Sequence, residues 1–183
     1  GREPPQQTIR PLINNYYKQQ SESVNSEESP AARIARNMDV YFTNPWAMVE
    51  DGVIWTNDQT DLLNPFKRFP NEPWLEIVTK QWLDERLVLV PKSRRMKMSW
   101  LMVFLHLHFV MFNEGMSVYF ISSKEEKSDE LVKRAEFIIQ HIPDDQFLKP
   151  AYKGSYCYLD FPGLNSFIQG IAMGADQLRQ FTA

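Results

Sequence analysis

This sequence has a single cysteine, no net positive charge and no long apolar run, and each of these features excludes a class of protein. Cys157 is the single cysteine, which excludes an internal disulfide framework and fits a reducing compartment. The formal net charge of −3 and the pI near 5.7 argue against a general nucleic-acid coat, which needs a basic surface. The longest apolar run, residues 100–112, is shorter than the roughly 20 residues that a membrane-spanning helix needs.

The sequence does contain enough apolar material for a folded core. Apolar residues make up 43% of the chain and aromatic residues 13%, so its 183 residues suit one domain with an appendage. Residues 1–29 are rich in Gln, Asn, Ser, Glu and Pro, and this composition predicts a flexible N-terminal arm. The apolar patch at residues 9–13 suits either a docking peptide for a neighbouring protein or a segment that lies on its own domain.

Residues 30–73 are predicted to form a helical N-terminal segment that serves as a lid before the first strand. The Ser-Pro pair at 29–30 supplies an N-cap and a first helical residue. Asn-Pro at 44–45 and Asp-Gly at 51–52 interrupt the helical pattern, and residues 53–56 suit a short strand. This segment leads through several prolines into another predicted helix, over about residues 74–84.

The chemistry of the chain is concentrated where an apolar run changes abruptly into a cluster of cations. Residues 87–90 are apolar and partly β-branched, which is the pattern of a strand buried on both faces of a parallel sheet. Pro91 ends this run, and residues 99–112 are apolar over a length that favours a buried helix. A strand, a short polar loop and a helix form the layout of a phosphate-binding loop, in which loop amides and the helix N-terminus face a phosphate.

The loop itself departs from the standard motif G-x-x-x-x-G-K-[ST]. Over residues 92–99 only Ser99 agrees with it: Lys92 replaces the first glycine, Lys97 the second, and Met98 the lysine. A lysine at the front of the loop can reach the same phosphates from the other side, because its four-carbon stem is long and flexible. We therefore predict that Lys92 binds phosphate. The alternative interpretation is that the basic loop is a solvated cationic turn.

Strands and helices alternate downstream of the loop. Residues 118–123 predict a strand, and a helix with a serine cap at Ser123 is expected to follow it. The expected core face of this helix consists of Leu131, Ala135, Ile138, Ile139 and Ile142. Residues 156–160 are apolar and end in Asp160, so they superficially resemble a Walker B strand. The Pro-Gly turn at 162–163 instead favours a hairpin with the next apolar run.

Two histidines in the long apolar run are the obvious candidates for metal ligands. His106 and His108 are two positions apart, which places them about 200° apart around a helix. They therefore cannot hold one metal ion together. We interpret them as core or surface histidines.

Residues 92–100, Lys-Ser-Arg-Arg-Met-Lys-Met-Ser-Trp, resemble the deviant Walker A loop of the large terminases of tailed bacteriophages, the motors that pump DNA into procapsids. In that family a loop of the Lys-Ser-Arg-Gln type carries its lysine at the front. Residues 118–143 are similar to the family's second strand and long helix, and residues 165–179 resemble its hairpin and arginine-bearing turn. The resemblance covers roughly residues 65–183, and it rests on the order of several weak motifs.

The resemblance implies an α/β fold of the P-loop NTPase-like, additional-strand class, with a central, mostly parallel sheet flanked by helices. Residues 74–183 would be the ATPase core, preceded by the helical N-terminal extension. The family's strand ending in Asp-Glu, which binds magnesium and activates water, would come just after residue 183, and the nuclease domain beyond it. We expect this incomplete core to be inactive or weakly active.

The resemblance also assigns roles to the loop. It implies that Lys92 binds the β- and γ-phosphates of ATP, that Ser99 binds Mg²⁺, and that Arg94 acts as a finger on the transferring phosphoryl group. The backbone amides from Ser93 to Met98 would cradle the phosphates; this stretch includes Arg95, Met96 and Lys97. Arg95 suits either the finger role or a contact with a core carboxylate. Trp74 falls near the place where relatives stack an aromatic ring on adenine.

Lys97 is the clearest departure from the family. A glycine is conserved at its position in the loop, so a positive backbone φ at Lys97 would be strained. The glutamine that accompanies the adenine-side aromatic residue in many relatives is missing near Trp74, and Gln180 replaces a common glycine after Arg179.

The partners implied by the resemblance are double-stranded DNA, a portal protein, a small terminase subunit and further copies of the chain in a ring, with no membrane. The place implied is the cytoplasm of the infected bacterial host, at the procapsid portal, and not the mature virion. Two other functions stay open. One is a non-catalytic docking module of a phage assembly protein, and the other is a different, helicase-like P-loop ATPase.

Overall fold

The computed structural model describes residues 38–58, 61–91, 96–142 and 148–173. The chain divides into two compact units, residues 1–44 and 45–183. In the first unit residues 38–43 are helical, and the Asn44 N–H donates to the Val40 carbonyl. The helix ends there because Pro45 disfavours helical backbone at the residue before it. The predicted arm at 1–29 and the predicted helix start lie outside the described residues, and the predicted domain boundaries stay predictions.

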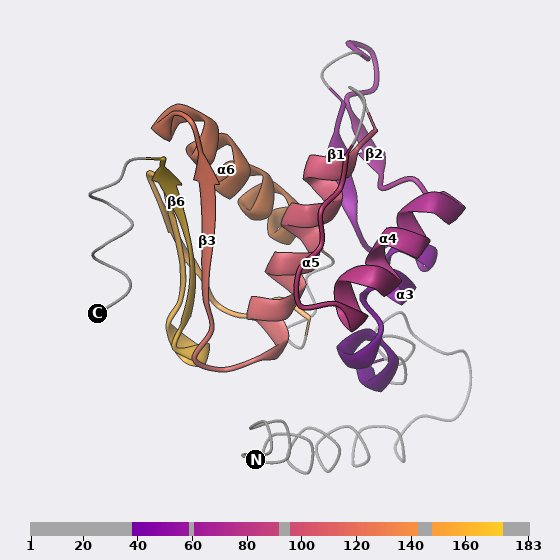
Figure 1. Ribbon diagram of the computed structural model, residues 1–183, viewed down its shortest axis with the longest axis horizontal. Coiled ribbons are helices and arrows are strands. Elements are labelled where there is room, and N and C mark those ends of the chain that lie inside the picture. The colour runs from indigo at the N-terminus through magenta and orange to yellow at the C-terminus, as the bar shows by residue number, and fades with distance from the viewer. Residues whose placement is uncertain (1–37, 59–60, 92–95, 143–147, 174–183) are drawn as a thin grey trace. The chain divides into compact units, whose positions relative to one another are not determined.

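The second unit alternates helices and strands (Figure 1). Its elements are α3 (Pro45–Glu50), β1 (Trp55–Asn57), β2 (Phe66–Arg68), α4 (Pro73–Asp84), α5 (Met98–Phe112), β3 (Ser117–Ser122), α6 (Glu125–His141), β4 (Lys153–Ser155), β5 (Tyr158–Phe161), the 3₁₀ turn η2 (Pro162–Leu164) and β6 (Ser166–Ala172). The helices predicted over 74–84 and 99–112 are therefore confirmed, as are the interruptions at 44–45 and 51–52. Among the described residues, no helix combines the length and the apolar character needed to span a bilayer.

The main sheet has four described strands in the order β3-β6-β5-β4. β3 and β6 are parallel, whereas β6 with β5 and β5 with β4 are antiparallel. The α/β class is confirmed, but the described sheet is mixed and not mostly parallel as expected. The reason is local: the turn η2 and the two-residue loop at 156–157 produce hairpins, which force antiparallel pairing. Helices α5 and α6 both contact β3 and β6, and they also contact each other (Figure 1).

The largest departure from expectation concerns residues 87–90. Their apolar pattern predicts a buried strand, but they form no strand, and Leu87 and Leu89 are 89% and 91% exposed. A strand in a buried parallel sheet needs hydrogen-bonded neighbours along its edges. None of the described strands pairs with this run. The prediction of a buried strand at 87–90 is therefore wrong for this structure, because the pattern contains no information about pairing partners.

Helix α6 packs closely on β6. Its buried positions include Val132, Ala135, Ile138 and Ile139, so most of the predicted core face is confirmed, although Leu131 is half-buried. A Cβ at Gly170 on β6 would lie 3.0 Å from the backbone carbonyl of Ser128, which explains the glycine at this crossing. The predicted serine cap is wrong: Lys124 is the N-cap and makes no side-chain cap hydrogen bond.

The predicted hairpin after residue 156 is confirmed. β5 and β6 pair antiparallel across η2, and Asp160 lies opposite Phe167 in the register. Asp160 therefore lies in a hairpin strand, which is not the place of a Walker B aspartate at the end of a central parallel strand. The turn between β4 and β5 is tied to α6, because Cys157 has a φ of 54° and its N–H donates to Asp129 Oδ1 at 2.9 Å.

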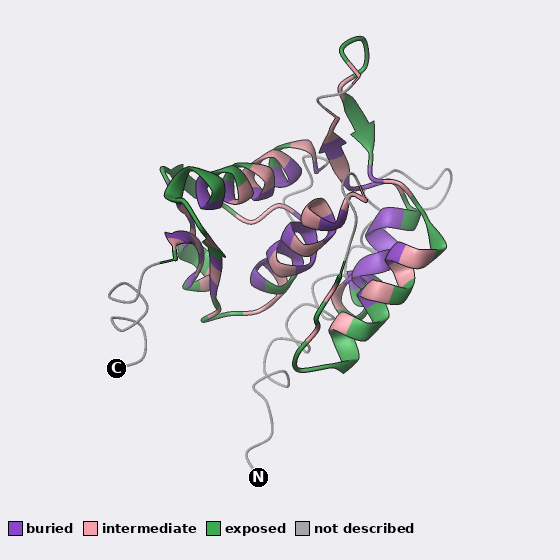
Figure 2. Ribbon diagram, turned by 45° about the horizontal axis from the view of Figure 1, so that its top comes forward, coloured by how far each residue is buried: buried purple, intermediate pink, exposed green. Residues whose placement is uncertain are grey.

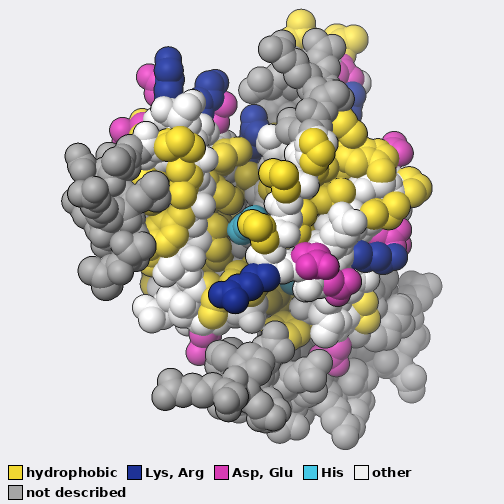
Figure 3. Space-filling view, in the orientation of Figure 1, with side chains coloured by type: hydrophobic (Ala, Val, Ile, Leu, Met, Phe, Trp, Pro, Cys, Tyr) yellow, Lys and Arg dark blue, Asp and Glu magenta, His cyan; other side chains and the backbone are white. Residues whose placement is uncertain are grey.

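Helix α5 occupies the centre of the unit, whereas α4 has a wide exposed side (Figure 2). A helix that is apolar all round must be buried on most of its surface, and α5 meets this condition. On α4 the fully buried residues are Leu75 and Thr79, while Ile77 is 57% exposed. On the face shown in Figure 3, exposed hydrophobic side chains gather over α4 and the extended segment that follows it.

Candidate functional site

The candidate site lies where the basic loop meets the N-terminus of α5. Lys97 is the N-cap of this helix and has left-handed backbone angles, φ 50° and ψ 7°. The N–H groups of Trp100 and Leu101 both donate to the Lys97 carbonyl at 3.0 Å, which closes the first turn. The Lys97 side chain makes no cap hydrogen bond to that turn. The first amides of the helix are consequently not capped by this side chain, and such amides favour an anion.

Lys97 adopts the positive φ that the sequence analysis identifies as strained for a residue other than glycine. For a residue with a Cβ this region costs about 1 kcal/mol relative to right-handed backbone, and glycine avoids the cost. Asn165 at the end of η2 is left-handed too, but asparagine tolerates that conformation better than lysine does. Lys97 is therefore held in an unfavourable conformation by its surroundings.

The Lys97 ammonium group contacts the hairpin formed by β1 and β2. Its Nζ lies 3.1 Å from Asp58 Oδ2, and the two side chains are 28% and 22% exposed. Asp58 is the first residue after β1, and its own N–H donates to the Pro65 carbonyl at 2.6 Å. Asp58 could not be found from a sequence motif, because it precedes Lys97 by 39 positions and no motif connects them.

The predicted site residues fall into three groups. Lys92, Ser93, Arg94 and Arg95 lie outside the described residues, so their roles stay predictions. Met96, Lys97, Met98 and Ser99 are contiguous at the start of α5; Met98 is buried, and the other three are half-buried. Trp74 is half-buried near the start of α4, and no described ring contact or hydrogen bond joins it to residues 96–99.

Met98 is part of the hydrophobic core. Its side chain is only 5% exposed, at the first position of α5. The motif position normally given to a phosphate-binding lysine is thus occupied by a core residue. Ser99, the next residue, lies in the first turn of the helix, where a hydroxyl is close to the first backbone amides.

An aromatic cluster borders the site and was not predicted from the sequence. It consists of Trp55, Phe66, Trp100, Phe137 and His141, contributed by the β1–β2 hairpin, α5 and α6. Phe137 and His141 are stacked with their ring centroids 4.0 Å apart, and the Trp100 ring meets Phe137 edge-on at 5.6 Å. Because the rings come from three separate elements, only the fold brings them together.

Arg134 on α6 connects this cluster to the start of α5. Its guanidinium carbon lies 5.5 Å from the centroid of the Trp100 ring, a cation–π distance. Burial lowers the pKa of Arg134, while Glu130 acts in the opposite direction. An arginine remains charged at neutral pH despite such a shift, so Arg134 places a fixed positive charge beside the residue that follows Ser99.

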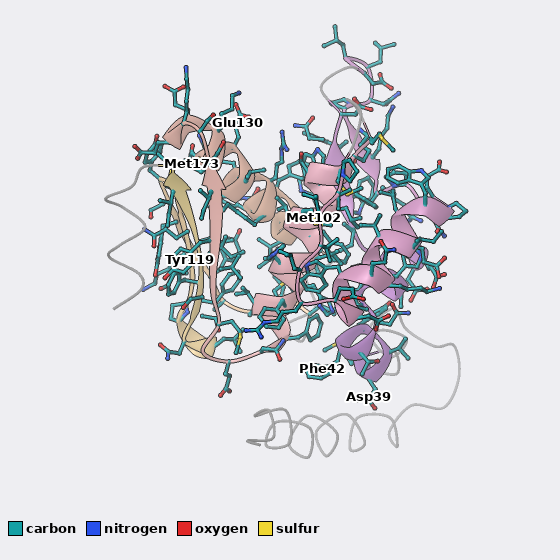
Figure 4. All side chains as sticks on the ribbon, viewed as in Figure 1. Asp39, Phe42, Met102, Tyr119, Glu130 and Met173 are labelled. Atoms are coloured by element: carbon teal, nitrogen blue, oxygen red, sulfur yellow. The ribbon has the colours of Figure 1, made fainter. Side chains whose placement is uncertain are left out.

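The two histidines of α5 pack among aromatic rings. His106 Nδ1 lies 2.7 Å from the carbonyl oxygen of Met102, a residue labelled in Figure 4. Burial lowers the pKa of His106, although the contact with Met102 acts against it. His108 is 6% exposed and lies against Phe112. His108 is thus a core histidine and His106 is half-buried, which agrees with the interpretation of the pair as core or surface histidines. Among the described residues, no group of three side chains is arranged to hold a metal ion.

No protein-family model matches the chain, and no curated protein is similar to it in sequence. The assignment of a function therefore depends on the residues of the loop and on the geometry at the start of α5.

Proposed function

We propose that residues 92–97 and the first turn of α5 bind the phosphates of ATP, and that the chain is the ATPase part of a phage terminase large subunit. The observation that carries the proposal is the left-handed Lys97 directly before α5. This conformation joins a short basic loop to the N-terminus of a 15-residue buried helix. A helix N-terminus carries partial positive charge and N–H donors, which are suited to a phosphate.

Each loop residue has a separate role in this proposal. Lys92 binds the β- and γ-phosphate oxygens, and Arg94 places positive charge on the transferring phosphoryl group during in-line attack by water. The amides between Ser93 and Met98 cradle the phosphates. Ser99 fits as a ligand of Mg²⁺, because this half-buried residue places a hydroxyl in the first turn of α5. When bound, Mg²⁺ would supply charge neutralisation between the β- and γ-phosphates.

Hydrolysis in this proposal powers translocation of viral double-stranded DNA into procapsids. The partners would be the portal protein, the small terminase subunit and further copies of the chain in a ring. The place would be the host cytoplasm at the procapsid portal. Because the net charge of −3 argues against a broad basic surface, a DNA contact would be local or made by other parts of the protein.

A non-catalytic docking module is the second candidate, and a specific observation favours it. Leu62 and Leu63 are each 90% exposed near the tip of the β1–β2 hairpin, and Leu87 and Leu89 are about equally exposed. Large apolar side chains that are held in solvent commonly mark contact sites for other proteins. The absence of a described strand at 87–90 also favours this candidate over a complete ATPase core.

Calorimetric titration of Mg·ADP and a non-hydrolysable ATP analogue separates the two candidates. We expect the unmodified chain to bind nucleotide, and Lys92→Ala to weaken binding by about tenfold or more, because a charge-assisted hydrogen bond contributes roughly 1.5–3 kcal/mol. Lys124→Ala is the matched control, since Lys124 is an exposed lysine directly before the other long helix, α6. Met98→Ala is unsuitable as a control because Met98 is buried.

Two results would contradict the proposed phosphate site. If a correctly folded chain binds no nucleotide, or if Lys92→Ala and Lys124→Ala behave alike, the proposed phosphate site is wrong. The docking module would then be the better account.

A further inference from the structure

The ion pair between Asp58 and Lys97 joins two parts of the fold that are far apart in sequence. Asp58 belongs to the β1–β2 hairpin, and Lys97 is the residue at which the basic loop enters α5. The atoms Nζ and Oδ2 are 3.1 Å apart, and more than two thirds of each side chain is buried. Partial burial strengthens such a pair relative to one on the open surface, because water screens it less.

The hairpin that carries Asp58 contacts the rest of the unit through both of its strands. The Phe69 N–H donates to the Ile54 carbonyl at 2.8 Å, and Ile54 is fully buried. The Phe66 ring lies 5.4 Å from Phe137 and 5.5 Å from His141, both on α6. The carboxylate of Asp58 therefore belongs to a hairpin that contacts α6, and it can restrict the lysine.

Lys97 needs such a restriction. Its φ of 50° is a conformation that glycine adopts freely and lysine adopts at a cost. A chain with lysine at this position spends part of its time in other backbone conformations unless another contact favours the left-handed one. The ion pair with Asp58 is a contact of this kind, and it also directs the ammonium group of Lys97 toward the hairpin.

We propose that Asp58 is a positioning residue for the phosphate loop: it holds Lys97 in the left-handed conformation that sets the entry into α5, and it retains the Lys97 ammonium group. The ion pair thereby favours the backbone conformation that a glycine would adopt freely at this position. This inference rests on the proposed nucleotide binding for its functional consequence, while its structural part stands on the Asp58–Lys97 geometry alone.

Four variants test the inference. Asp58→Asn removes the charge of the carboxylate and keeps its shape, whereas Lys97→Gly removes the ion pair and the backbone strain together. The double variant, Asp58→Asn with Lys97→Gly, separates the ion pair from every other contact that Asp58 makes. Asp84→Asn is the matched control, because Asp84 is an exposed acid at the end of α4.

The first measurement is the Kd for Mg·ADP. We expect Asp58→Asn to raise this Kd about fivefold in the natural sequence and less than about twofold in the Lys97→Gly background, since an ion pair that is partly buried is worth a factor of this order. A tighter Kd in Asp58→Asn would overturn the proposal, because Asp58 would then be withholding Lys97 from the phosphates. Equal effects in the two backgrounds would also overturn it.

The second measurement is hydrogen exchange without nucleotide, and it separates failure of this inference from failure of the proposed function. We expect Asp58→Asn to speed exchange at the amides of residues 98–101, and Asp84→Asn to leave them unchanged. If the chain binds no Mg·ADP but this difference in exchange is present, the nucleotide site is wrong and the positioning role of Asp58 remains. If exchange is the same in both variants, the positioning role is wrong whatever the Kd values are.

Discussion

The crossing of α6 over β6 gives the sharpest prediction about stability. Replacing Gly170 by alanine puts a Cβ 3.0 Å from the carbonyl carbon and the carbonyl oxygen of Ser128, both of which are backbone atoms of α6. Backbone atoms cannot rotate away as a flexible side chain can, so α6 or β6 must shift. Overpacking of this kind costs about 1–3 kcal/mol. We therefore expect Gly170→Ala to lower the free energy of unfolding by that amount.

The matched control is Gly163→Ala in the turn η2. A Cβ at Gly163 meets no atom within 4 Å, so this change has no steric cost. Loss of glycine also reduces the conformational entropy of the unfolded chain, which stabilises a protein by up to about 1 kcal/mol where the backbone is compatible. Urea denaturation of the two variants measures the difference, read as a shift in midpoint at constant m-value. If Gly170→Ala were as stable as Gly163→Ala, the described packing of α6 on β6 would be refuted.

Three further predictions concern other parts of the chain. Leu87→Ser and Leu89→Ser should each change the free energy of unfolding by less than about 0.5 kcal/mol in urea denaturation, because both side chains are exposed. A decrease of about 2 kcal/mol or more would instead indicate that residues 87–90 form a buried strand. Burial lowers the pKa of His106, so its contribution to stability is complete above its unfolded pKa near 6.5 and is lost as the pH falls through the folded pKa. His106→Phe should therefore flatten the decline of melting temperature below about pH 6.5, and an unchanged decline would contradict this. Burial acts to raise the pKa of Asp129, but the Lys133 ammonium group and the Cys157 N–H outweigh burial, so the pKa is lowered. Asp129→Asn should therefore reduce the free energy of unfolding at neutral pH and weaken the loss of stability that occurs as the pH falls below about 4.

The local elements were predictable because their signals are local. The apolar stretch of α5 is too long for a strand, and the spacing of Ala135, Ile138 and Ile139 matches a helix with one buried face. The turn at 162–163 likewise predicts the hairpin of β5 and β6. Each of these predictions needs only residues that are neighbours in sequence.

The conformation of residues 87–90 and the contacts at the candidate site were not predictable, because they depend on elements that are distant in sequence. The run at 87–90 has the composition of a buried strand, but composition does not determine which strand pairs with it. The Asp58–Lys97 ion pair forms only after folding. The same is true of the contacts that Trp55, Phe66 and Trp100 make with α6. The loop alignment was enough to show that a positive φ at Lys97 would be strained, whereas the conformation itself and the acid that contacts this lysine came only from the structure.

The most direct test of the central claim is hydrogen exchange of the amides at residues 96–101 with and without Mg·ADP. The account predicts that nucleotide slows exchange at the amides of residues 96–99, because phosphate oxygens accept hydrogen bonds from those N–H groups, whereas the Trp100 and Leu101 N–H groups already donate to the Lys97 carbonyl. The first turn of α6, residues 125–128, is the internal comparison and should be unaffected. Unchanged exchange at α5 under saturating nucleotide, or equal protection of both helix starts, would contradict the account.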